Sequence, residues 1–516
     1  MQPTVDTRYG RLCGTESRGI RCFRGVRYAR PVRGALRFQP PEPPEPWAGT
    51  RKATQPGPAA PQFALPWFGW ISAAGVKPSQ DCLSLNIWSP GLDEGRRPVL
   101  VWIHGGGFLV GSGATAVYNG QDLARRGNVV VVTINYRLGA LGYAHLKNVL
   151  GAGFERSTNL GLRDQVAALE WVREHIERFG GDPGNVTVVG QSAGAMSIGA
   201  LLGAPRARRL FHRAVLQSGA AQNVMEPEEA GFVARTFLGE LGGPPPTPDA
   251  LGRIPVSRIL AAQRATMTQL SDWNRRLMIF QPVVDGDVIP QQPMAAVERG
   301  ETAHIPMLLG TTLDEWKLFR VVDPGVRRLH NRDLVARFHS VLMNHRGAPD
   351  PEQAVEDFRA AVEARGGSGS PTDLWSAFQS ARIMHLPATR LAEAQTKAGG
   401  SAHAYLFTWQ PPGVLRAMGA CHGLEIPFVF GSTGHPFARP FTGLTGAATR
   451  LSRKMQHAWL RFARHGAPAL DRLPPWPGYE APQRKTMIFG RTCELADAPL
   501  EAERSLLDRW LGAATS

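Results

Sequence analysis

Four short apolar runs between positions 97 and 219 predict strands that are buried on both faces. They cover residues 98–104, 129–134, 186–189 and 214–216. Their residues are apolar without alternating with polar ones, which is typical of parallel strands that helices cover on both sides. The first part of the chain therefore predicts a parallel sheet.

Residues 161–179, between the second and third of these runs, form a predicted amphipathic helix. Apolar side chains recur there at three- and four-residue steps, which places them on one face that can pack against a sheet. Asp164 falls in the expected first turn and Arg178 in the last, where each charge opposes the helix dipole. Strand, helix and strand in this order predict an α/β fold, with a mostly parallel, twisted central sheet and helices on both faces.

The rest of the chain predicts further strands separated by two helical segments. Strand-like runs return at residues 305–309 and 403–409, and an amphipathic helix follows near 451–462. Glycines and prolines interrupt helical patterns at about 221–301 and 321–400. We predict a single domain over all 516 residues, in which these two segments are helical insertions that cover one end of the sheet.

The strongest local motif is Gly-Gln-Ser-Ala-Gly at residues 190–194. It follows a predicted strand directly and leads into a helix of small residues at 195–202. This is the context of a nucleophile elbow, a strained turn that exposes a serine hydroxyl at the edge of an α/β sheet. A chance match in a glycine-rich chain is the alternative, and the order of strand, motif and helix argues against it. Ser192 is the predicted nucleophile.

A second glycine-rich motif, His-Gly-Gly-Gly-Phe at residues 104–108, ends another buried strand. Adjacent glycines expose backbone N–H groups that side chains would crowd. We predict that the N–H groups of Gly106 and Gly107, with that of Ala193, form an oxyanion hole. A phosphate cradle is the alternative, but no Gly-Lys-Ser/Thr follows and the spacing does not fit G-x-G-x-x-G.

A serine hydroxyl needs a base, and the base needs a carboxylate that orients it. In an α/β hydrolase these follow the serine in the order acid, then histidine. Eleven histidines follow Ser192, so chain order alone does not select one. His422 lies between Gly419 and Gly423 after a predicted strand, and the neighbours Asp314 and Glu315 follow another. Their positions make them candidates and leave the choice within the acidic pair open.

The net charge of +15 raises the question of nucleic-acid binding. Only 7 of the 58 basic residues are lysines, and the arginines are scattered through a chain rich in alanine, glycine and proline. A typical cluster, at residues 206–209, has no interleaved aromatic residues on which bases could stack. We expect no nucleic-acid partner.

The five cysteines are widely spaced and form no C-x-x-C pair, so neither a zinc site nor a disulfide framework is expected. The first residues are charged where a secretory signal would be apolar. No apolar stretch approaches the roughly 20 residues that cross a bilayer. We expect a cytoplasmic protein without a membrane-spanning segment.

The ordered motifs along the chain resemble those of the type-B carboxylesterase/lipase family, which includes cholinesterases and bacterial para-nitrobenzyl esterases. The resemblance spans nearly the whole chain. Besides the two glycine motifs, it rests on residues 23–29, 81–88, 135–137, 179–183, 217–219, 282–286, 310–315 and 422–431. It implies an α/β-hydrolase fold, with Glu315 rather than Asp314 as the acid and His422 as the base. It also places Ser218 near the acid.

The chain departs from the family pattern at several positions. The family usually has glutamate before the nucleophile and before Asp81, whereas this chain has Gln191 and Gln80. Fewer carboxylates near the serine disfavour a cationic substrate. Cys82 has no neighbouring cysteine upstream, unlike many secreted relatives, which favours a reducing compartment. The resemblance also places the aromatic residues Trp67, Phe68 and Trp70 in the segment that forms part of the gorge wall.

We therefore predict a serine carboxylesterase that hydrolyses small-molecule carboxylic esters, of short to medium acyl chain, through an acyl-enzyme intermediate. Ser192, Glu315 and His422 form the predicted catalytic triad, supported by Gln191 and Ser218. We expect no metal or organic cofactor and a monomer or small homo-oligomer. The alternatives are an aryl carbamate or amide hydrolase with the same residues, and a catalytically inactive binding protein on the same fold.

Overall fold

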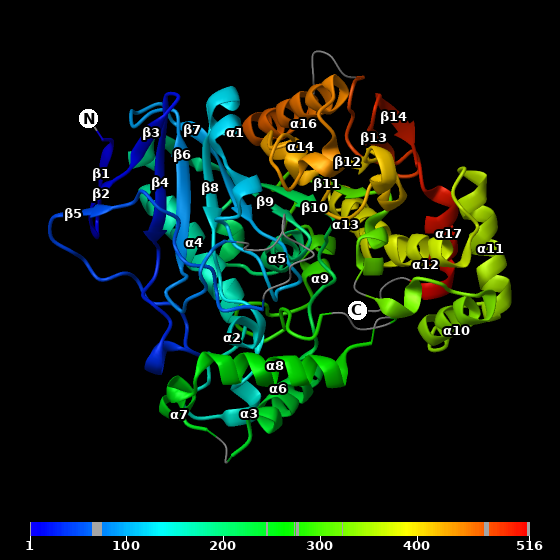
Figure 1. Cartoon of the computed structure of the whole chain (residues 1–516), viewed down its shortest axis with the longest axis horizontal. Helices are drawn as coiled ribbons and strands as arrows, with labels where there is room; N and C mark the ends of the chain where they lie inside the picture. The colour runs from blue at the N-terminus through cyan, green and yellow to red at the C-terminus, as the bar shows by residue number, and fades with distance from the viewer. Residues whose placement is uncertain are drawn as a thin grey trace.

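The centre of the molecule is a large twisted sheet (Figure 1). The computed structural model describes residues 2–63, 75–243, 246–272, 274, 278–321, 323–468 and 474–512. Within these residues the sheet has eleven strands in the order β14-β13-β12-β11-β10-β9-β7-β8-β6-β4-β3. In chain order the strands are β3 (Thr15–Ser17), β4 (Ile20–Arg27), β6 (Ser84–Ser89), β7 (Arg97–Ile103), β8 (Val130–Ile134), β9 (Gly181–Gln191), β10 (Arg213–Gln217), β11 (Met307–Thr312), β12 (Ala402–Phe407), β13 (Lys485–Phe489) and β14 (Cys493–Asp497).

The middle of this sheet is parallel. Strands β8, β7, β9, β10, β11, β12 and β13 pair in parallel with their neighbours in that series. The pairs at the two edges, β8 with β6, β6 with β4, β4 with β3 and β13 with β14, are antiparallel. The predicted α/β fold with a mostly parallel central sheet is confirmed. A separate small sheet joins β1 (Thr4–Thr7), β2 (Gly10–Cys13) and β5 (Thr50–Lys52).

Strand β7 explains why the predicted strands have no polar face. Its side chains alternate between two hydrophobic clusters on opposite sides of the sheet. Val99, Val101 and Ile103 belong to the first cluster, and Leu100 and Trp102 belong to the second. Since neither face meets water, every position after Arg97 in this strand is apolar.

Helices cover both faces of the sheet. The first face carries α4 (Leu160–His175) and α5 (Ala193–Leu202), and the second carries α14 (Ile426–Phe430) and α16 (Gly446–His465). The shorter helices before α4 are α1 (Gln121–Gly127), α2 (Gly139–Tyr143) and α3 (Lys147–Leu150). No helix in the described ranges is long and apolar enough to cross a membrane.

Helix α4 differs from its prediction at both ends. Residues Ile176–Phe179, predicted as its last turn with Arg178, form a 3-10 helix, and α4 itself ends at His175. It begins at Leu160, so Asp164 lies beyond the first turn. The Asp164 carboxylate instead pairs with Arg137 at 2.7 Å, and both side chains are almost completely buried. The helix was predicted in the right place, but the reason for the aspartate is a distant partner rather than the helix dipole.

The two segments predicted as helical insertions contain most of the remaining helices. Figure 1 shows α6, α7 and α8 below the sheet and α10, α11 and α12 at its side. The helices of the first segment are α6 (Pro227–Leu241), α7 (Pro248–Arg253), α8 (Val256–Leu270) and α9 (Pro293–Glu298). Those of the second are α10 (Asn331–Leu342), α11 (Pro351–Ala364), α12 (Pro371–Ser380), a π-helical turn (Ala381–His385) and α13 (Leu386–Lys397). The short helix α15 (Arg439–Thr442) precedes α16.

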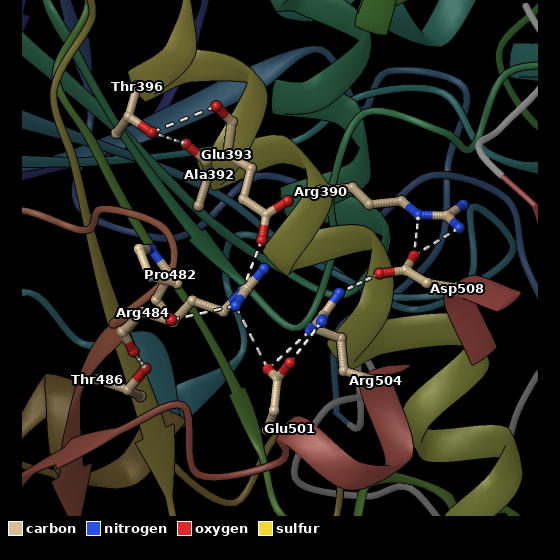
Figure 2. Close-up of polar contacts among 10 residues, drawn as sticks. All are labelled: Arg390, Ala392, Glu393, Thr396, Pro482, Arg484, Thr486, Glu501, Arg504 and Asp508. Carbon is tan, nitrogen blue, oxygen red and sulfur yellow. Dashed lines mark hydrogen bonds and ion pairs between the residues drawn. The ribbon is translucent and has the colours of Figure 1, made fainter. Parts of the chain in front are cut away.

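Helix α17 (Glu501–Leu511) packs against the second of these segments. Its Leu506, Leu507 and Trp510 complete a third hydrophobic cluster with α10, α11 and α12. A continuous series of ion pairs also joins α17 to α13 (Figure 2). In order, it runs from Glu393 through Arg484, Glu501, Arg504 and Asp508 to Arg390.

Candidate active site

Ser192 lies on a sharp turn between β9 and α5. Its backbone has φ 57° and ψ −129°, a combination that is costly for a residue with a side chain. The motif glycines permit this turn. A Cβ at Gly190 would lie 2.5 Å from the backbone of Gly194, and one at Gly194 would lie 2.0 Å from the carbonyl oxygen of Ile103. Only glycine fits at both positions, which fixes the serine above the carboxyl end of the sheet.

The glycine loop after β7 passes directly beside Ser192. A Cβ at Gly105 would lie 3.0 Å from the Cβ of Ser192. Gly106 and Gly107 have φ values of 113° and 61°, which glycine adopts without strain. No backbone carbonyl among the described residues accepts a hydrogen bond from the N–H groups of Gly106, Gly107 or Ala193. The three predicted donors are therefore free to bind a negatively charged oxygen.

His104, the first residue of this motif, contacts both the loop and Tyr136. Its ring stacks on Tyr136 with centroids 4.5 Å apart, and its Nδ1 lies 2.8 Å from the carbonyl oxygen of Gly105. The Tyr136 hydroxyl donates to the carbonyl oxygen of His104 at 2.7 Å. Burial lowers the pKa of His104 to about 4, so this imidazole is neutral and holds the loop in place.

Glu315 and His422 meet in the interior, although 106 residues separate them in the chain. The Nδ1 of His422 lies 2.5 Å from the Oε2 of Glu315, and both side chains are buried. Asp314, the other candidate acid, points elsewhere. Its carboxylate accepts from the N–H of Ala420 at 2.9 Å and pairs with Lys317. The geometry thus distinguishes the two neighbouring carboxylates, which chain position alone could not.

Two further donors hold the Glu315 carboxylate. The hydroxyl of Ser218 donates to its Oε1 at 2.6 Å, and the N–H of Thr312 donates to the same oxygen at 2.7 Å. Burial opposes ionisation of Glu315, but His422 and these hydrogen bonds outweigh it and lower the pKa of Glu315 below its ordinary value. The carboxylate is therefore charged and can stabilise an imidazolium.

The opposite edge of His422 faces Gln191. The amide Nε2 of Gln191 lies 3.2 Å from the Nε2 of His422. No hydrogen bond joins the hydroxyl of Ser192 to His422 within the described part of the chain. Ser192 follows Gln191 directly and is partly exposed, so the serine, the imidazole and the carboxylate gather at one place.

Sequence reasoning did not find a third carboxyl group, Glu425, which lies at the start of α14. Its Oε1 accepts from the amide of Gln217 at 3.0 Å, and Trp459 of α16 donates to the other atom of that amide at 2.9 Å. Burial, followed by the nearby charge of Glu315, raises the pKa of Glu425 to about 7. The His-Gly-Leu-Glu-Ile-Pro-Phe segment at residues 422–428 contained this residue, but nothing in it indicated the partners, which come from β10 and α16.

No group of three or more histidine, cysteine, aspartate or glutamate side chains in the described ranges could hold a metal ion. Trp67, Phe68 and Trp70, the expected gorge-wall residues, lie outside the residues that the structure describes. All five cysteines are free thiols.

Comparison with known proteins agrees with this geometry. The carboxylesterase family model matches residues 1–505. The chain is 36% identical to the para-nitrobenzyl esterase of Bacillus subtilis, over 98% of both chains, and 35% identical to the phenmedipham hydrolase of Pseudarthrobacter oxydans, over 95% of both.

Solved structures show the same similarity. A carboxylesterase of Geobacillus stearothermophilus superposes with a TM-score of 0.86 at 38% identity, covering 98% of this chain and 99% of that one. A thermophilic para-nitrobenzyl esterase superposes with a TM-score of 0.85 at 34% identity, covering 98% and 100%. The chain therefore belongs to the carboxylesterase family, of the type-B class, and is a carboxylic ester hydrolase that acts on small esters.

Proposed function

We propose that Ser192, His422 and Glu315 carry out this ester hydrolysis as a catalytic triad. The main support is the arrangement at the elbow. A strained serine lies beside three free backbone N–H groups and next to a buried histidine–carboxylate pair. Each of these parts has a defined role in acyl transfer.

In the first half of the reaction, the Oγ of Ser192 attacks the carbonyl carbon of the ester while the Nε2 of His422 takes the hydroxyl proton. Glu315 holds the other ring nitrogen and stabilises the imidazolium. When the tetrahedral intermediate collapses, the bond to the alcohol oxygen breaks and that oxygen takes the proton from Nε2. The products of this half are a free alcohol and an acyl ester on Ser192.

The negative charge of the intermediate falls on the former carbonyl oxygen, which the N–H groups of Gly106, Gly107 and Ala193 bind. Loss of one such donor typically costs about 100- to 1,000-fold in turnover. A water molecule then attacks the acyl carbon while the Nε2 of His422 takes its proton. The bond to the Oγ of Ser192 breaks, that oxygen takes the proton from Nε2, and the carboxylic acid leaves. Every step uses side chains, backbone N–H groups and water, so the proposed cycle requires no cofactor.

We propose esters of short to medium acyl chain as the substrates. The identity to a para-nitrobenzyl esterase supports a small aromatic alcohol as one leaving group. An aryl carbamate or amide remains the second candidate, because the same residues would cleave it. Phenmedipham belongs in the test panel because a relative is named for its hydrolysis.

The test is hydrolysis of para-nitrophenyl esters from acetate to laurate by the wild type, by Ser192→Ala and by a control, Ser17→Ala. Ser17 lies exposed on the edge strand β3. We expect activity that peaks at a short or medium chain, is unchanged in the control and falls by several orders of magnitude in Ser192→Ala. Undiminished activity in folded Ser192→Ala would refute the assignment. A fluorophosphonate probe should label the wild type and the control but not Ser192→Ala.

We also propose that the whole chain acts as one domain, with helical insertions at about 221–301 and 321–400. Support comes from the first hydrophobic cluster, which draws side chains from Val5 through Tyr479. Limited proteolysis should then give no stable half-molecule. We further propose a monomer or small homo-oligomer in the cytoplasm, consistent with five free thiols. Light scattering and cell fractionation test these points.

A further inference from the structure

The amide of Gln191 is wedged between the loops that carry the other parts of the site. Gln191 ends β9 and its side chain is fully buried. A Cβ at Gly105 would lie 3.1 Å from its Oε1, and a Cβ at Gly423 would lie 3.4 Å from its Nε2. The amide therefore lies between the oxyanion loop and the turn that follows His422.

The nitrogen and the oxygen of this amide differ in their hydrogen-bond partners. The Nε2 lies 3.2 Å from the Nε2 of His422, whereas the buried Oε1 has no hydrogen-bond partner among the described residues. An amide nitrogen only donates, so this contact requires a lone pair on the imidazole. The imidazole offers that lone pair in the form whose proton is on the Nδ1 that faces Glu315.

During catalysis the same edge of the imidazole changes from acceptor to donor, because Nε2 takes the proton of Ser192. A glutamine can follow this change. Its carboxamide carries a donor and an acceptor in one planar group, and a half-turn about the Cγ–Cδ bond exchanges them. A glutamate could only accept, and an apolar side chain could do neither.

We propose that Gln191 is a positioning residue that holds the Nε2 edge of His422 in both protonation states, as donor to the imidazole and as acceptor from the imidazolium. The proposal rests on the proposed function, in which His422 carries the proton. In the resting state, the amide keeps the ring aligned with Glu315. After proton transfer, Oε1 can accept from the Nε2–H of the imidazolium until the alcohol oxygen takes that proton.

Because several carboxyl groups already lie near His422, the absence of a charge on Gln191 should affect how easily the imidazole is protonated. Around His422 lie Glu315 at 2.5 Å, Glu425 at the start of α14, Asp314 beneath Ala420, the thiol of Cys421 and the ring of Phe319 at 5.2 Å. Two of the carboxyl groups, those of Glu315 and Glu425, are fully buried. A further carboxylate at position 191 would favour the imidazolium, whereas glutamine adds no charge.

The test compares Gln191→Glu, which has the same shape but only accepts, with Gln191→Met, which has similar volume and no strong hydrogen-bonding group. The readout is kcat/KM for a para-nitrophenyl ester from pH 5 to 9. In Gln191→Glu we expect the acid limb of the profile to move to higher pH by about 1 unit or more, because a charge within hydrogen-bond distance stabilises the imidazolium. In Gln191→Met we expect kcat to fall about tenfold with KM and the acid limb unchanged.

A purely structural role would lower the yield or the thermal midpoint without moving the acid limb. Circular dichroism and thermal melting therefore accompany both variants. The proposal is overturned if Gln191→Glu keeps the wild-type profile, or if Gln191→Met keeps kcat within about twofold of the wild type. Labelling by the fluorophosphonate probe across the same pH range gives a second measure that does not depend on deacylation. Loss of the proposed function itself is distinguishable, since the Ser192→Ala comparison would then show no serine-dependent activity in the wild type.

Discussion

The buried carboxyl group of Glu425 makes the stability of the protein depend on pH in a way that one substitution should remove. Within the described part of the chain, the Oε1 of Glu425 accepts from the amide of Gln217 and its Oε2 has no hydrogen-bond partner. Glu425→Gln keeps the shape and can still accept from Gln217. It replaces a group that ionises with one that does not.

The size and sign of this pH dependence follow from the difference between the unfolded and the folded pKa of Glu425. In the unfolded chain the carboxyl ionises at its ordinary value of 4.5, whereas burial, followed by the charge of Glu315, raises the folded pKa to about 7. Below the lower value the group is protonated in both states and contributes nothing. Between the two values the unfolded state loses its proton first, so the free energy of unfolding falls by about 1.4 kcal/mol per pH unit. Above the upper value the full penalty, about 3 kcal/mol, is reached and stays constant.

The assay is urea unfolding of the wild type and Glu425→Gln at four pH values from 5 to 8.5, followed by tryptophan fluorescence. The two proteins share every other titratable group. The difference between their free energies of unfolding at each pH therefore reports the titration of Glu425. We expect the variant to gain stability relative to the wild type as pH rises, by an amount of order 3 kcal/mol between the ends of the range. Glu16→Gln, on the exposed edge strand β3, is the control and should show no such trend. A difference that is the same at all four pH values would refute the reasoning.

Three other substitutions test the site and the core. Gly106→Ala should lower kcat by about 100-fold or more, since its Cβ would lie 2.0 Å from a backbone carbonyl oxygen; Gly107→Ala, whose Cβ meets nothing within 4 Å, should cost less in the same assay. Ser218→Ala removes a hydrogen bond that lowers the pKa of the proposed acid, so kcat/KM at pH 7 should fall about tenfold; an unchanged value would contradict this role. Asp164→Asn leaves Arg137 charged and buried without its ion-pair partner, so chemical denaturation should show a loss of about 3–5 kcal/mol.

The strands that the sequence predicted best are those with the strongest burial. The run at 98–104 became β7, and the run at 129–134 became β8, each within one residue at either end. Both strands lie in the middle of the sheet, where the two faces are covered and nearly every position is apolar. The pattern alone therefore determines them. The nucleophile elbow could also be predicted from the sequence, because its glycines stand where a side chain would collide with nearby backbone atoms.

The polar contacts behind the site could not be predicted in this way. Gln191 contacts His422, and Gln217 contacts both Glu425 and Trp459, across more than 200 residues in each case. Such contacts depend on side-chain directions in the assembled sheet, which leave no periodic signal in the chain. Asp164 illustrates the same limit. A local rule explained its place in a helix, but its partner lies on another loop.

The attachment of α17 has a consequence for the order in which the protein is made. The helices α10, α11 and α12 leave the ribosome long before α17, which supplies Leu506, Leu507 and Trp510 to their hydrophobic cluster. Until then, apolar side chains of these helices that α17 covers are open to water in the growing chain. Exposed surface of this kind favours association with other unfinished chains. We therefore expect chaperones to protect these helices until α17 has been made and its hydrophobic side chains and ion pairs cover them.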